Sequence, residues 1–271
     1  MKRVIIIFAC ALWWMNAESQ QIPTFSQYAE NLLLINPAVA GSEERSIYSL
    51  NQRLQWMGME DAPKTSCFSA QGNLGNSKAP KFLKKIKVGS GKKPSVGLGG
   101  FIYNDQNVKL LSQTGAQLAY AYHIPFRGST KFSMGLALSG MQARIDRTKV
   151  ISTVPEPILM ANKPQTYAID ASVGFLLSNR AYYAGLSTMQ VMGSLLSFGS
   201  KSYTKVRHYY LVGGYNFDVN ASYTICPSAL LRTTDQFSTF QTDVSCKVIY
   251  MDTFWGGVSY RTNKEIVCFV G

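Results

Sequence analysis

Residues 166–178 read TYAIDASVGFLLS, and in this stretch larger apolar residues alternate with small or polar ones. In a strand, one face would carry Tyr167, Ile169, Ala171, Val173, Phe175 and Leu177. The other face would carry Ala168, Asp170, Ser172, Gly174 and Ser178. A period of two predicts a β-strand. The second face is small and sparsely charged, whereas the outer face of a soluble sheet is rich in Lys and Glu. This stretch is therefore typical of a strand in a membrane β-barrel.

The same alternation recurs from residue 45 onward. It predicts twelve strands, at residues 45–56, 64–73, 95–104, 111–123, 130–143, 166–178, 181–190, 206–217, 220–233, 238–249, 252–262 and 265–271. Most have the length of roughly ten residues that lets a tilted strand cross a bilayer. We therefore predict an all-β fold, a transmembrane antiparallel β-barrel that occupies residues 45–271.

The connections between these segments alternate in length. Short links lie at 178–181, 217–220 and 249–252, a slightly longer one at 124–129, and long ones at 143–165 and 191–205. Outer-membrane barrels have short periplasmic turns and longer external loops, so the short links predict the periplasmic side. Periodicity alone leaves open a soluble periplasmic β-sandwich, whose apolar rows would lie buried between two sheets.

The N-terminus predicts export of the mature protein. A short basic start, an apolar run over residues 4–15 and a small-x-small motif at residues 17–19 are typical of a secretory signal peptide. We predict that residues 1–19 form this peptide and that cleavage follows Ser19. Residues 20–44 lack the alternation, and we expect them to form a periplasmic N-terminal segment that plugs or caps the barrel. No later run reaches the roughly 18 apolar residues of a transmembrane helix.

The composition and motifs exclude several classes of protein. The chain has 271 residues, a net charge of +12 and 12% aromatic residues, which excludes a disordered chain. His123 and His208 have no zinc-ligand spacing around them, and no phosphate-binding or hydrolase motif is present. The GLGG run at 97–100 lies inside a predicted strand, where glycine favours close packing over phosphate binding. We therefore predict no enzyme activity, no cofactor and no metal site.

Charged residues gather on the predicted inner face. The alternation places Asp170 and Asp243 there, with Arg232, Lys247 and Arg261. We interpret them as a polar network that fills the barrel interior, with a contact surface for a bound cargo segment as the alternative.

Four cysteines follow the predicted cleavage site, namely Cys67, Cys226, Cys246 and Cys268. The alternation places Cys226 inward and Cys246 outward, and side chains on opposite faces cannot form a disulfide. We therefore predict free thiols, although a bulge at Pro227 would shift the phase and change this assignment.

Four stretches carry a resemblance to a known family. They are FSQYAENLLLINPAVAGS (25–42), NQRLQWMGMEDAPKT (51–65), AYAYHIPFRGSTKFSMGLALSG (119–140) and GGVSYR (256–261). Together they resemble the PorP/SprF family, outer-membrane proteins of Bacteroidetes associated with type IX secretion and gliding. The resemblance implies a single non-enzymatic barrel, usually of about fourteen strands. Since twelve strands are predicted here, we expect a chain truncated at its C-terminus.

The resemblance also implies protein partners. Some family members are similar to anchors that hold a secreted adhesin through its C-terminal domain, and others to links with periplasmic ring and peptidoglycan-binding components. We expect type IX secretion components, cargo C-terminal domains and outer-membrane lipid as partners, with no nucleic acid and no small-molecule substrate. A passive porin-like channel is the alternative function.

Two groups of residues are predicted to bind these partners. The first, in the first hairpin, consists of Arg53, Gln55, Trp56, Pro63 and Lys64. The second, in the basic stretch 74–94, consists of Lys81, Lys84, Lys85 and Lys87. The positive charge of this stretch suits an acidic periplasmic protein or anionic lipid headgroups.

Overall fold

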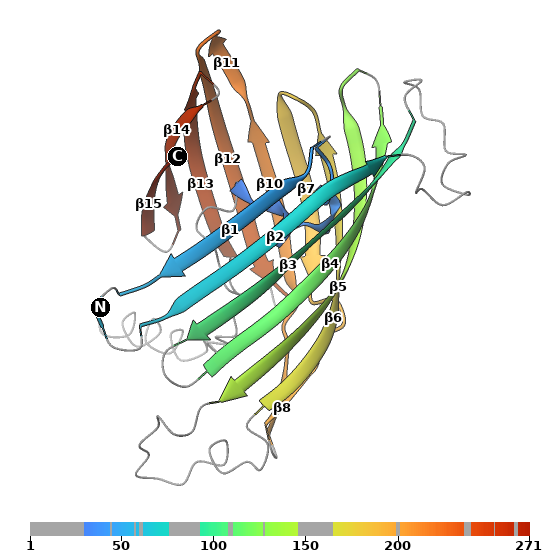
Figure 1. The fold of residues 1–271 in the computed structure, drawn as a ribbon, viewed down its shortest axis with the longest axis vertical. Helices are drawn as coiled ribbons and strands as arrows, with labels where there is room; N and C mark the ends of the chain where they lie inside the picture. Colours follow the sequence, from blue (N-terminus) through green and yellow to red (C-terminus); the bar gives the residue numbers. More distant parts are fainter. Residues whose placement is uncertain are drawn as a thin grey trace, which may run out of the picture.

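The computed structural model contains one large antiparallel sheet of thirteen strands and a separate two-stranded hairpin (Figure 1). It describes residues 30–43, 45–56, 58–59, 62–75, 93–107, 111–126, 128–145, 165–198, 201–235, 240–251, 253–262 and 265–271. Helical structure in these residues is limited to short 3-10 turns, including η2 (Leu32–Leu34) and η3 (Pro37–Val39). None of the described helices is long and apolar enough to cross a membrane.

The strands follow one another along the sheet almost in chain order. They are β1 (Ile47–Leu54), β2 (Lys64–Gly75), β3 (Ser95–Asn107), β4 (Leu111–Pro125), β5 (Lys131–Ile145), β6 (Gln165–Ser178), β7 (Tyr182–Met189), β10 (His208–Tyr215), β11 (Phe217–Asn220), β12 (Tyr223–Thr234), β13 (Phe240–Tyr250), β14 (Phe254–Arg261) and β15 (Glu265–Val270). β8 (Leu195–Phe198) and β9 (Lys201–Thr204) form the hairpin. Neighbouring strands pair antiparallel, and the sheet curls about its long axis with tilted strands (Figure 1). In the described part of the chain the edge strands β1 and β15 do not pair with each other, so the sheet is not closed.

The two faces of the curled sheet differ in the way that the alternation predicts. Large apolar side chains point away from the curve into open space, and Leu50, Leu118 and Ile266 are 79%, 76% and 73% exposed. The concave face buries small and polar side chains, such as Ser133 and Ser172. The predicted all-β fold with apolar residues outside is therefore confirmed. The alternative of a β-sandwich is not supported, because the described residues include no second large sheet that covers these apolar rows.

All twelve predicted strands are present, but three short strands were missed. β8 and β9 lie in the segment 191–205, which was predicted as a long loop, and β11 lies in a predicted short link. Each has four residues. A four-residue strand holds two side chains per face, too few for a recognisable alternation.

Pro227 lies in β12 without a bulge. β12 pairs with β10 as far as Ser228 and with β11 from Ile225, so Pro227 falls at the interruption between these two partners. On its other side the register with β13 is continuous through Cys246. The missing N–H of proline therefore coincides with a break in the ladder. Cys226 therefore lies on the inner face of the sheet, as the alternation predicts.

Candidate functional site

The concave face of the sheet holds an inner segment, which we define as residues 30–43. It contains η2 and η3, seen in dark blue within the curve of the sheet in Figure 1. Leu33, Ala38 and Ala40 in this segment are at most 1% exposed. Leu33 packs against Ala119 and other alanines of β4 and β5. A 3-10 turn with this degree of burial needs partners for its backbone groups, and the sheet supplies them.

Asn36 forms the N-terminal cap of η3. Its side-chain oxygen accepts a hydrogen bond from the backbone N–H of Ala38 at 2.9 Å, and Pro37 occupies the first position of the turn. Both are typical of helix starts. The Nδ2 group of the same side chain donates to the carbonyl oxygen of Phe175 in β6 at 3.0 Å. One buried carboxamide therefore both shapes the turn and joins it to the sheet.

Groups from six strands bind the inner segment through hydrogen bonds. The side chains are Ser69, Gln71 and Asn73 in β2, His123 in β4, Lys131 in β5, Ser187 in β7 and Lys247 in β13, and Phe175 in β6 contributes its backbone carbonyl. His123 shares its two ring nitrogens between Ser133 Oγ at 2.7 Å and the Ala40 carbonyl oxygen at 2.9 Å. His123 is therefore a hydrogen-bonded structural residue.

A row of glycines lets the inner segment approach the sheet backbone. A Cβ atom at Gly97 in β3 would lie 2.7 Å from the Ala40 carbonyl carbon, and one at Gly135 in β5 would lie 2.5 Å from the Ala38 Cα. At Gly185 in β7 it would meet Asn36 Nδ2 at 2.8 Å. Real Cβ atoms do not come this close to a neighbour, so these positions require glycine. The close-packing interpretation of the GLGG run is confirmed at Gly97.

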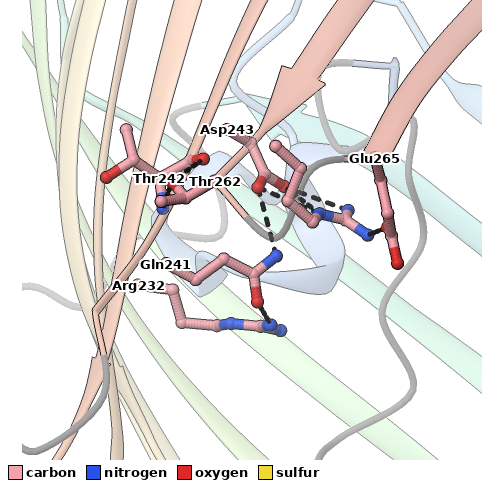
Figure 2. Close-up of polar contacts among 7 residues, drawn as sticks. Arg232, Gln241, Thr242, Asp243, Thr262 and Glu265 are labelled. Atoms are coloured by element: carbon pink, nitrogen blue, oxygen red, sulfur yellow. Dashed lines mark hydrogen bonds and ion pairs between the residues drawn. The ribbon is translucent and has the colours of Figure 1, made fainter.

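A polar network occupies the concave face across β12 to β15 (Figure 2). Arg261 Nε donates to both carboxylate oxygens of Asp243, at 3.0 and 3.1 Å, and its Nη1 donates to Glu265 at 2.7 Å. Gln241 donates to Asp243 at 3.1 Å and accepts from Arg232. The structure therefore brings together three of the predicted inward charges.

The other two predicted inward charges lie apart from this network. Lys247 contacts Glu30 of the inner segment at 2.8 Å and lies over the Trp255 ring at 5.4 Å. Asp170 accepts hydrogen bonds from the backbone N–H groups of Ala171 and Met192, at 2.9 and 3.0 Å, and so fixes the loop after β7. Lys205 lies near Asp170. Burial lowers the pKa of Lys205, and the Asp170 carboxylate partly offsets this effect.

The remaining potential metal ligands stay separate. His208 is buried, and its ring nitrogens have no hydrogen-bond partner among the described residues. The described part of the chain contains no group of three His, Cys, Asp or Glu side chains arranged to hold a metal ion. The thiols of Cys67, Cys226, Cys246 and Cys268 are free, as predicted.

The five predicted partner-binding residues of the first hairpin lie together at the end of the β1–β2 ladder. The backbone N–H of Gln55 donates to the Pro63 carbonyl at 3.1 Å, and Lys64 pairs with Leu54 in the ladder. Trp56 is 62% exposed and has a φ of 50°. A positive φ is rare for a bulky residue and marks a strained turn. Lys81, Lys84, Lys85 and Lys87 lie outside the described residues.

Sequence reasoning missed a pocket at the opposite end of the strands, where the short turns lie. It has a volume of about 650 Å³ and lies between the end of the inner segment and the turns at residues 125–126, 128–130 and 179–181. Its lining comes from three separate parts of the chain: Leu32, Val39, Ser42, Glu43 and Arg45; Pro125 and Gly128–Lys131; and Leu176, Ser178–Arg180 and Tyr183. No local motif predicts such a site, because only the fold brings these parts together.

Two comparisons with known proteins bear on this chain. The family model described as "Type IX secretion system membrane protein PorP/SprF" matches residues 17–271. A comparison with curated proteins found no match.

Proposed function

Because the chain belongs to the PorP/SprF family of type IX secretion system membrane proteins, we propose that it acts in the outer membrane as a non-enzymatic component of the secretion or gliding machinery. Its role there is to bind protein partners, either the C-terminal domains of secreted cargo or periplasmic components. The family is one of secretion components and is not an enzyme family.

The observation that carries the membrane location is the polarity of the two sheet faces. Rows of aliphatic and aromatic side chains cover the convex face, for example Leu136, Leu138 and Ile169 at 62%, 61% and 64% exposure. An apolar surface of this extent is untypical of a protein surrounded by water. It suits contact with hydrocarbon, where only backbone groups that are fully paired in strands are tolerated.

The inner segment argues for a binding role over a porin-like channel. It lies on the concave face, where the water path of a porin would run, and is held by hydrogen bonds to six strands. Steady conductance through the purified protein in planar bilayers would favour the channel. We expect no steady conductance.

The proposed contact sites are the two groups predicted from the sequence. Trp56 and Lys64 present an exposed aromatic ring and a positive charge at the long-loop end, which faces outward on this proposal. Exposed aromatic residues often dominate the binding energy of protein interfaces. The basic stretch with Lys81, Lys84, Lys85 and Lys87 would act on the periplasmic side through its charge.

The test is chemical cross-linking in intact outer membranes, with bound type IX components quantified by mass spectrometry. The test variants are Trp56→Ala and a variant with the four lysines changed to Gln. The matched control is Arg144→Ala, because Arg144 is also exposed near the long-loop end. We expect each test variant to lose a defined set of partners that the control keeps. Equal cross-linking in all variants would remove these residues from the proposed site, and release of the protein by alkaline carbonate would contradict the membrane location.

A further inference from the structure

The pocket at the short-turn end combines an apolar floor with a positive rim. Leu32, Val39 and Leu176 form part of the floor, and Val39 and Leu176 are buried. Among the described residues, the rim holds three basic residues, Arg45, Lys131 and Arg180, and one acidic residue, Glu43. A volume of about 650 Å³ lies within the range of sites that hold small ligands or a few side chains of a partner.

The charges of the rim are only partly compensated by its own groups. Arg45 pairs with Glu43 at 2.9 Å, and both side chains are largely exposed. Lys131 Nζ donates to the backbone carbonyl of Ser42 at 3.2 Å, which satisfies one donor but leaves the charge. Arg180 is exposed at the turn between β6 and β7. The described lining residues therefore keep a net charge of +2, from three basic residues and one acidic residue.

The rim is fixed by hydrogen bonds between its two turns. Asn179 Nδ2 donates to Thr130 Oγ1 at 3.2 Å, and its Oδ1 accepts from Ser129. Within each turn, Phe126 N–H donates to Thr130 at 2.8 Å and Asn179 N–H donates to Tyr182 at 2.7 Å. A site whose walls are already ordered loses less conformational entropy when a ligand binds.

We propose that this pocket binds an acidic peptide segment of a periplasmic partner, with an apolar side chain on the floor and carboxylates on the basic rim. The proposal rests on the proposed function, which places the short-turn end in the periplasm. The pocket is separate from the two contact groups proposed above, and the ligand proposed for it is an acidic peptide.

The position of the floor favours a peptide over other anionic occupants. Leu176 and Val39 lie on the concave side of the sheet, whereas lipid chains would run along the convex side. A lipid whose headgroup reached the rim would therefore leave the apolar floor uncovered. A second copy of the chain is disfavoured by charge, because each copy carries a net charge of +12.

The experiment measures binding of a fluorescein-labelled peptide that alternates Leu with Glu to the purified full chain in a nonionic detergent. A matched peptide carries Gln in place of each Glu. The pocket variants are Arg180→Glu, which reverses a rim charge, and Ser178→Trp, which fills the pocket. Arg144→Glu is the matched control, because it reverses a charge at the far end of the strands.

We expect saturable binding of the Glu peptide, weakened about tenfold by Arg180→Glu and by the change to Gln, and by raised salt. Ser178→Trp should abolish binding, and Arg144→Glu should leave it unchanged. Equal binding of the two peptides, no binding of either, or equal loss in Arg144→Glu would overturn the proposal. Displacement of the peptide by soluble short-chain phosphatidylglycerol, but not by short-chain phosphatidylcholine, would assign the pocket to lipid headgroups instead.

The outcome can be separated from that of the proposed function. If peptide binding fails while Trp56→Ala still loses partners in membranes, only the pocket proposal is wrong. If the peptide binds as expected but the cross-linking variants keep all partners, only the assignment of the first hairpin and lysine stretch is wrong.

Discussion

The carboxamide of Asn36 occupies the space that a side chain at Gly174 would need. A Cβ atom at Gly174 would overlap Asn36 Oδ1 and lie 2.9 Å from Pro37 Cδ. The same carboxamide donates to the carbonyl oxygen of Phe175, the next residue in β6. Sheet and inner segment are therefore fitted to each other at this point, and a change in either one affects both.

A methyl group at Gly174 should separate the inner segment from β6. We expect Gly174→Ala to lower the free energy of unfolding by about 1–3 kcal/mol, because overpacking displaces the Asn36 cap. Gly140→Ala is the control, since a Cβ atom there has no neighbour within 4 Å. That variant should be neutral or slightly stabilising. Urea unfolding in detergent, followed by tryptophan fluorescence, measures both, and equal stability of the two variants would contradict the fit.

Removal of the Asn36 side chain should also destabilise the protein. Asn36→Ala removes the bonds to Ala38 and Phe175 and leaves the buried N–H of Ala38 without its Asn36 acceptor. We expect a loss of about 2 kcal/mol in the same unfolding measurement. Asn104→Ala removes an exposed bond to Thr114 and should cost less than about 0.5 kcal/mol. If Asn104→Ala lowered the free energy of unfolding more than Asn36→Ala does, the bonds of the inner segment would add little stability.

Because the ion pair of Asp243 and Arg261 is buried, changing Asp243 should cost far more stability than changing the exposed acidic residue Glu265. The side chains of this pair are 5% and 7% exposed, whereas that of Glu265, the second partner of Arg261, is 53% exposed. Asp243→Ala should cost about 3–5 kcal/mol, because it leaves a buried guanidinium without its main partner. Glu265→Gln should cost less than about 1 kcal/mol. Thermal unfolding monitored by circular dichroism distinguishes the two, and equal costs would be inconsistent with the burial of the network.

The thiols provide a test of which face meets lipid. Cys246 and Cys268 are exposed on the convex face, and Cys67 is buried. In detergent-free membranes we expect a membrane-permeant maleimide to label Cys246 and Cys268, while a charged, impermeant maleimide should label neither. Single-cysteine variants and mass spectrometry identify each site. Efficient labelling of Cys246 by the charged reagent in intact vesicles would place this face in water.

Trp56 allows its ring and its backbone strain to be tested separately. Trp56→Gly and Trp56→Ala both remove the ring, but only glycine relieves the positive φ of 50°. We expect both variants to lose the cross-linked partners. Trp56→Gly should be more stable than Trp56→Ala, by about 1 kcal/mol in urea unfolding. If Trp56→Ala keeps its partners, the exposed ring serves only as an anchor at the rim of the sheet.

Alternation alone was sufficient to predict the long strands and their outer face. Residues such as Leu138 and Ile169 lie outward as their phase in the sequence requires. The short strand β11 could not be predicted, because its four residues are too few for a recognisable alternation. The sequence predicts that residues 20–44 plug or cap the barrel, but not that Asn36 meets Gly174, which lies far along the chain. The short-turn pocket escaped prediction for the same reason, since its walls are distant in sequence.

The bonds of the inner segment also bear on the order of folding. Asn36 and Phe175 are 139 positions apart, Ser187 and Ile35 are 152 apart, and Lys247 and Glu30 are 217 apart. Neighbouring strands, by contrast, form hairpins whose contacts are local. Distant contacts carry a larger entropic cost of chain closure and slow folding. The hairpins should therefore assemble first, and Lys247 and Glu30 should meet only once most of the sheet has formed.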